Sequence, residues 1–406
     1  MLTRNSLLIF FTFCIVIWLA PNTGLAQNSV AEFHNLLRAK AAFDETGFAA
    51  LEQGQTVVRL LPVQDKREVA VCGLVGLKVP ADVFLQSFRE GMARRTNPAI
   101  LEIGTLSSTP SIDDLRTLTF EDRDLDDMKE CVVGDCRLKL SAAMIERFHR
   151  EVDLRAPDYR SQATQLLKQM LLEYVREYLA RGDMALIEYN DKAQEVRVVE
   201  EQHALVTASN YVNDVISKFP QALKGFSTSE LRLVENAIVW SKIKFGLKPV
   251  IAINHIMVYK RDKETGPQVL IASRQIYANH YFNSSVALTA FVKIPGVNPG
   301  SYLFYENRSL ADGLEGAFSK IKRGIVEDKA IAGLKTILES SRVNLNARGL
   351  QPDESMPTAD EGQSWRRWKV GRVYVYLCLF LITSLFALFA LGNYNWKGDL
   401  SRGAPH

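Results

Sequence analysis

The chain has 406 residues and a net charge of +3, with 47% apolar and 23% charged residues. This composition is that of a globular protein with enough apolar side chains for a sizeable core. The small net charge, together with the lack of a basic run interleaved with aromatic residues, argues against nucleic acid as a partner. We expect one large folded domain with extensions, or two or three smaller ones.

The N-terminus has the pattern of a secretory signal peptide. Arg4 supplies a positive charge, Leu7 to Ala20 is almost wholly apolar, and residues 24–26 (Gly-Leu-Ala) place small side chains before the expected cleavage point. The apolar run is about 14 residues long, shorter than the roughly 20 that cross a bilayer, so we predict a signal peptide over residues 1–26. The alternative is an uncleaved anchor, and both place the following residues outside the cytoplasm.

A second apolar segment, Val373 to Leu391, lies near the C-terminus and carries no charge. Its length fits a bilayer core, and tryptophans and tyrosines flank both ends, as they do at membrane interfaces. We predict a polar linker over residues 344–368, a transmembrane helix over 369–392 and a short tail over 393–406. The lipid bilayer is therefore an expected partner.

The orientation of this helix has conflicting signals. More basic residues precede the helix than follow it, which opposes the positive-inside rule for an exported body. The first targeting segment usually determines the orientation, so we expect a single-pass protein whose body is periplasmic or at the cell surface. The charge distribution leaves the final topology open.

Three cysteines lie between the two apolar segments. Cys131 and Cys136 bracket a short loop in which Gly134 helps the chain to turn back, so we predict a disulfide between them, as export permits. The spacing matches neither a CxxC redox motif nor a zinc site. Cys72 is either a buried apolar residue or a competing disulfide partner.

The body, residues 27–343, is expected to be α+β. Its first part alternates between helices and strands, and a helical insertion covers about residues 111–224. Within the insertion, the acidic stretch Glu121–Asp127 is interpreted as a solvated loop or a helix start. The expected helices are Ala31–Gln53, Pro80–Arg94, Ser161–Arg181 and Glu201–Lys218, and the expected strands are Thr56–Pro62, Glu68–Val79, Ile100–Leu106, Leu115–Phe120, Ala185–Tyr189 and Glu195–Val199.

The second part of the body, residues 230–305, consists of long β-rich runs joined by short turns that contain Gly or Pro. Such runs predict an antiparallel meander. Its strands are expected over Leu231–Lys244, Pro249–Tyr259, Gln268–Tyr277, Tyr281–Lys293 and Ser301–Tyr305. A long amphipathic helix over residues 310–343 is expected to pack against the meander and to close the body.

The segment Val69 to Phe84 (VAVCGLVGLKVPADVF), with the late meander and the closing helix, resembles the helix-grip fold of START-like lipid-binding domains. The likeness is a pattern of elements rather than a sequence signature, and the helical insertion departs from it. The chain also resembles exported, membrane-anchored bacterial proteins that carry no known activity. The START-like resemblance implies a lipid or other apolar ligand, held between the meander and the closing helix.

The densest polar and aromatic cluster is Arg274 to Asn283. If it joins two strands, Tyr277, His280 and Tyr281 could line a groove, as aromatic residues with a few polar groups do in ligand pockets. His255 lies on the neighbouring predicted strand. The alternative for all four residues is a structural role, as hydrogen-bonded histidines among packing tyrosines.

The sequence contains no HExxH, GxSxG, GxxxxGK[ST] or GxGxxG pattern, so we assign no catalytic residue, no metal site and no cofactor. The first hypothesis for the function is a membrane-anchored module that binds a lipid or other apolar ligand. The alternatives are a structural or interaction protein of the envelope, with protein partners unknown, and an enzyme that uses His280 with Tyr277 or Tyr281.

Overall fold

The computed structural model describes residues 35, 37–38, 43–89, 99–209, 232–261, 266–294, 300–314 and 319–349. The predicted signal peptide, transmembrane helix and tail lie outside these residues. Among the helices that the structure describes, none combines the length and the apolar character needed to cross a bilayer.

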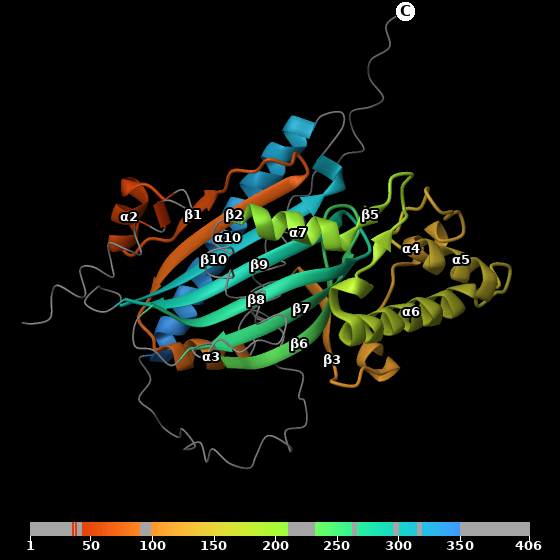
Figure 1. The fold of residues 1–406 in the computed structure, drawn as a ribbon, viewed down its shortest axis with the longest axis horizontal. Helices are drawn as coiled ribbons and strands as arrows, with labels where there is room; N and C mark the ends of the chain where they lie inside the picture. Colours follow the sequence, from red (N-terminus) through yellow and green to blue (C-terminus); the bar gives the residue numbers. More distant parts are fainter. Residues whose placement is uncertain are drawn as a thin grey trace, which may run out of the picture.

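A sheet of eight antiparallel strands forms the centre of the molecule (Figure 1). The strands lie in the order β1-β2-β10-β9-β8-β7-β6-β3. Their bounds are β1 Val57–Leu60, β2 Glu68–Leu77, β3 Ile100–Leu106, β6 Arg232–Ile243, β7 Val250–Lys260, β8 Gly266–Ala278, β9 Phe282–Lys293 and β10 Ser301–Ala311. Strands β6 to β10 are neighbours in chain order, so the predicted antiparallel meander and the α+β class are confirmed.

Both faces of the sheet are buried at β2, which is why this strand is apolar from Val69 to Leu77 rather than alternating with polar residues. Val71 and Val75 lie on the face that we call the inner face, against helix α10 (Ser319–Gly349) and helix α3 (Ala81–Arg89). Leu74 and its same-face neighbours lie on the outer face, against helix α2 (Glu45–Glu52). Helix α7 (Val198–Ala208) crosses the outer face over β9 and β10 (Figure 1).

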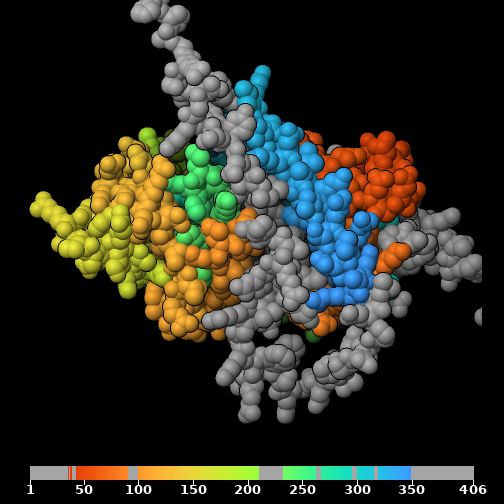
Figure 2. Space-filling view, turned by 180° about the vertical axis from the view of Figure 1, so that it is seen from behind, coloured from red at the N-terminus to blue at the C-terminus, as the bar shows by residue number. Residues whose placement is uncertain are grey.

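Helix α10 packs against β1, β2 and α3, and in Figure 2 it crosses the surface as a long blue ridge. It approaches β2 most closely at Gly73, where a Cβ would lie 2.5 Å from Leu338 Cδ1 and 3.1 Å from Leu334 Cδ2. Only glycine leaves room for these two leucines. This contact therefore determines how deeply the helix lies against the inner face.

The predicted bounds of the closing helix, 310–343, were wrong at both ends. Leu310 belongs to β10, where it pairs with Glu68 of β2 and Ser284 of β9, because two flanking ladders extend the strand beyond its predicted end. The helix continues to Gly349, since Leu345 is buried and the Asn346 side chain accepts a hydrogen bond from the Lys78 backbone N–H. The polar linker predicted from residue 344 therefore does not begin before residue 350.

The helical insertion comes between β3 and β6 in the chain, and its helices α4 to α6 lie beyond one end of the meander strands, whereas α7 returns over the sheet (Figure 1). Its elements are η3 Ile112–Leu115, α4 Asp122–Asp127, α5 Ala142–Glu151, α6 Tyr159–Arg181, η4 Gly182–Ala185, β4 Glu188–Tyr189, β5 Val196–Arg197 and α7. Helix α6 is the predicted helix Ser161–Arg181, and its apolar side packs on buried residues of β6, β7 and β8, such as Trp240.

One prediction for the insertion was wrong, and a second was confirmed only in part. The segment Leu115–Phe120 is not a strand, because Asp114 accepts hydrogen bonds from Ser107 and from the Ser111 backbone N–H and thereby folds the preceding residues into a turn. The predicted strand Glu195–Val199 is confirmed only as β5, which pairs with β4 as a short hairpin. Helix α7 begins directly after it, at Val198, because Val198 packs in the core with α6.

Replacing Gly73 with alanine should destabilise the fold by about 1–3 kcal/mol, because both leucines would have to shift in a packed core. Chemical denaturation of the purified chain measures this difference. Gly324→Ala is the matched control on α10: a Cβ there meets no atom within 4 Å, so the change should be neutral or stabilising by up to about 1 kcal/mol. Equal stability of the two variants would contradict the close approach of α10 to β2.

Candidate functional site

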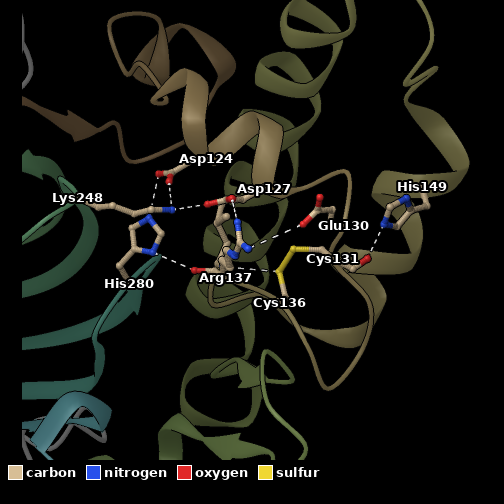
Figure 3. The surroundings of a disulfide bond; sticks show 10 residues. Asp124, Asp127, Glu130, Cys131, Cys136, Arg137, His149, Lys248 and His280 are labelled. Atoms are coloured by element: carbon tan, nitrogen blue, oxygen red, sulfur yellow. Dashed lines mark hydrogen bonds and ion pairs between the residues drawn. A yellow bond between two sulfur atoms is a disulfide. The ribbon is translucent and has the colours of Figure 1, made fainter. Parts of the chain in front are cut away.

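His280, the central residue of the sequence-predicted site, lies buried where the insertion meets the turn between β8 and β9 (Figure 3). Its Nε2 lies 2.9 Å from Asp124 Oδ2, and its Nδ1 lies 3.1 Å from the backbone carbonyl oxygen of Arg137. Both neighbours are hydrogen-bond acceptors, so the ring lies between two groups of the chain itself.

Two carboxylates and two cations complete this cluster, which we call the clasp: Asp124, Asp127, Arg137, Lys248 and His280. Lys248 Nζ lies 2.8 Å from Asp124 and 2.6 Å from Asp127, and Arg137 Nη1 lies 2.5 Å from Asp127 (Figure 3). The clasp thus joins α4 of the insertion to residues beside β7 and β9.

Of the two alternatives predicted for Glu121–Asp127, a solvated loop or a helix start, the helix start is confirmed, since Glu121 is the N-cap of α4. The stretch is only partly solvated, because Asp124 and Asp127 are buried. Burial alone would raise the pKa of Asp124, but hydrogen bonds from His280 and Lys248 outweigh it and lower the pKa below its usual value. The pKa is therefore lower in the folded chain than in the unfolded one. The resulting stabilisation is present above the unfolded pKa and is lost as the pH falls through the folded pKa.

A disulfide joins Cys131 and Cys136 next to the clasp, and Arg137 directly follows it (Figure 3). Gly134 has a φ of +88°, which favours glycine, and its backbone N–H donates to the Asn190 carbonyl at 2.8 Å. The short disulfide loop therefore connects α4 to the hairpin of the insertion. Cys72 lies buried in β2.

The other sequence-predicted residues lie in different surroundings. Tyr281 is close to His280, and its hydroxyl accepts the backbone N–H of Lys248 at 3.1 Å. Tyr277 is buried within the apolar core around α6, with its ring 6.4 Å from that of Tyr174 and 6.2 Å from that of Tyr189. The structure brings His280 and Tyr281 together but places Tyr277 in a packed aromatic group.

His255 lies on the outer face of β7, against α6. The Tyr178 hydroxyl donates to its Nδ1 at 2.7 Å, and its Nε2 donates to Asn236 Oδ1 at 2.5 Å, which corresponds to the neutral ring. Burial, followed by repulsion from Arg274, lowers the pKa of His255 from 6.5 to about 4. His255 thus has Tyr178 and Asn236 as partners, whereas His280 has Asp124, Arg137 and Tyr281, so the four predicted residues do not form one site.

A different set of polar side chains lies on the inner face, in the middle of the meander. We call it the inner polar band: Ser241, Asn254, Ser273, Gln275 and Asn283. Asn254 of β7 is paired with Gln275 of β8, and alternation along each strand turns these side chains toward the same face as the core valines and isoleucines. All five residues are buried.

The inner polar band lacks hydrogen bonds that its burial demands. Among the residues that the structure describes, neither the side-chain nitrogen nor the side-chain oxygen of Asn254 or Asn283 has a partner. The hydroxyl groups of Ser241 and Ser273 and the side-chain oxygen of Gln275 also lack one within the described part of the chain. Each such group costs about 1–3 kcal/mol unless water or a ligand satisfies it.

The neighbouring polar residues on the same face show a contrasting arrangement. Asn307 donates from Nδ2 to Ser285 Oγ at 3.0 Å, and Ser309 donates to Asn307 Oδ1 at 2.8 Å. Polar side chains on this face can therefore satisfy one another. The inner polar band, which extends from β9 to β6, does not do so among the described residues.

Apolar side chains adjoin the inner polar band along the strands. Ile256 and Ile271 continue the same face toward α3, where Phe84 stacks on Phe291 with ring centroids 5.2 Å apart. The inner face thus combines groups that need hydrogen-bond partners with an apolar wall. Amphipathic ligands, with a polar head and an apolar body, match such a surface.

Comparison with known proteins gives no further guide: no family model, no curated protein and no solved structure matches this chain. Within the described residues there is also no group of three or more His, Cys, Asp or Glu side chains placed to hold a metal ion.

Asp124→Asn should destabilise the fold by about 3 kcal/mol, because it leaves Lys248 and His280 with an uncharged partner in a buried position. Asp122→Asn is the matched control, since Asp122 is an exposed aspartate in the same helix. Denaturant unfolding near neutral pH compares the two variants. An equally small loss of stability in Asp124→Asn and Asp122→Asn would show that the clasp does not hold the insertion to the sheet.

The stability of the chain should rise between about pH 4 and pH 6.5, in part because His255 takes up its proton only in the unfolded state over this range. His255→Gln should flatten this part of the stability profile. His203→Gln, which replaces an exposed histidine of α7, should leave the profile unchanged. Denaturation followed across this pH range checks the expectation, and an unchanged slope in His255→Gln would contradict it.

Proposed function

We propose that this chain is a membrane-anchored, extracytoplasmic binding protein that holds an amphipathic, lipid-like molecule on the inner face of its sheet. The observation that carries the proposal is the inner polar band, whose buried amide and hydroxyl groups lack hydrogen-bond partners among the described residues. A ligand with a hydrogen-bonding head would supply those partners, and its apolar part would lie along the wall that includes Ile256 and Ile271.

The position of the inner polar band adds support. It lies on the inner face, in the half of the sheet next to the half that α10 covers. The resemblance to START-like domains implies a ligand on this face. Export and membrane attachment come from the apolar segments of the sequence and remain part of the proposal.

Catalysis by His280 has less support from the geometry. Both of its ring nitrogens face internal acceptors, Asp124 and the Arg137 carbonyl, so neither ring nitrogen is directed at a substrate. Tyr277 is enclosed by other tyrosines, with its pKa raised by burial. The arrangement fits a group that holds the insertion in place.

Interaction with an envelope protein is a second candidate function. The disulfide loop exposes two consecutive valines: Val132 is 57% exposed and Val133 is 47% exposed. Exposed apolar side chains at the tip of a cross-linked loop favour contact with a partner.

A double replacement, Asn254→Leu with Asn283→Leu, should remove the ligand without unfolding the chain, because leucine has a similar size and needs no hydrogen bond. Native mass spectrometry of the full-length chain, released from detergent micelles, should show a bound molecule of lipid size on the wild type, distinct in mass from the detergent. The double variant should lack it and should be as stable as the wild type or more stable.

Asn236→Leu is the matched control, since Asn236 is an exposed asparagine of β6, and it should retain the bound molecule. Two results would overturn the proposal: a wild type that carries no bound molecule, or a double variant that retains it. The first result would mean that ordered water satisfies the inner polar band.

A further inference from the structure

Helix α10 has a second apolar side, which faces away from the sheet. Ile321 is 63% exposed, Ile325 is 47% exposed and Val343 is 63% exposed. Together with the exposed Ala332, they recur at helical spacing on the side opposite the buried Leu334 and Leu338. We call these four residues the outward stripe; it follows a helix about 46 Å long at 1.5 Å per residue.

Basic residues flank the outward stripe. Three lysines of α10 are exposed: Lys320, Lys322 and Lys335. Lys66 is exposed on the neighbouring loop, and its backbone carbonyl accepts a hydrogen bond from Arg323 of α10. The three acidic residues on this helix balance only part of this charge: Asp328 is exposed, Glu339 is half-buried, and Glu327 forms an ion pair with Arg323 at 2.9 Å. An apolar stripe with a surplus of lysines is the pattern of a helix that lies in a membrane interface.

The sequence beyond α10 supplies a reason for a bilayer to be close. The predicted transmembrane helix begins at residue 369, about 20 residues after Gly349, and a flexible linker of that length spans roughly 25 Å on average. A body held at this distance meets the membrane surface at a high effective concentration, so a weak contact suffices to keep it there.

We propose that the outward stripe of α10 docks on the anionic surface of the bilayer to which the chain is attached. The isoleucines would enter the headgroup region, and the lysines beside them would contact anionic lipid headgroups, each lysine contributing about 1 kcal/mol. This inference rests on the proposed membrane attachment and is independent of the ligand. It would place α10, which covers the inner face, between that face and the lipid.

Lysine acylation of the full-length chain in lipid nanodiscs tests the docking. Lys320 and Lys322 should react about threefold more slowly in discs that contain phosphatidylglycerol than in discs of phosphatidylcholine alone, and added salt should reduce the difference. Lys244 is exposed next to the end of β6, near the edge of the sheet opposite to β1 and β2, and should react at the same rate in both kinds of disc. Mass spectrometry measures the three rates.

Replacing Ile321 and Ile325 with aspartate should abolish this slowing of the reaction at Lys320 and Lys322. Leu247→Asp, at a residue that is 89% exposed elsewhere on the surface, should preserve it.

Equal reaction rates of Lys320 and Lys322 in the two kinds of disc would overturn the docking while leaving the membrane attachment intact. A slower reaction that depends on the number of chains in a disc, and not on lipid charge, would also overturn docking on the bilayer. It would indicate that the outward stripe contacts a second copy of the chain. If the chain does not enter the discs at all, the proposed membrane attachment is overturned together with the docking. That result would not test the ligand proposed for the inner polar band.

Discussion

The architecture depends on the contact between α10 and the inner face at Gly73. Because β2 carries no side chain there, Leu334 and Leu338 reach the strand itself, and the helix lies close against one half of the sheet. The inner polar band lies in the other half, on β6 to β9, where the polar side chains remain buried without hydrogen-bond partners among the described residues. Tight packing at one end and unmet polar groups at the other are two properties of the same covered face.

Charged groups in this chain have two different uses. In the clasp, Asp124 and Asp127 are matched by Lys248, Arg137 and His280, and the disulfide loop lies beside them. Such matched charges hold the insertion to the sheet and leave little capacity for an external molecule. The inner polar band, in contrast, is uncharged, so its unmet hydrogen bonds do not require a counterion and suit a neutral or weakly polar head.

The meander could be predicted from the sequence because its strands are long apolar runs with short turns between them. Predictions failed where tertiary contacts override local pattern, as at Leu310, which two neighbouring ladders keep in β10, and at Val198, which core packing draws into a helix. The aromatic and histidine cluster was a visible signal, yet its members have internal partners. The inner polar band was missed because a single asparagine such as Asn254, within an apolar strand, shows its missing partners only when all neighbouring strands are in place.

A crystal structure of the full-length chain, at a resolution that shows ordered water, tests the central claim most directly. The account predicts elongated non-protein density on the inner face, with one end within hydrogen-bond distance of Asn254 and Asn283 and the rest along Ile256 and Ile271. Separate water molecules alone, bonded to each of these polar groups, would contradict it.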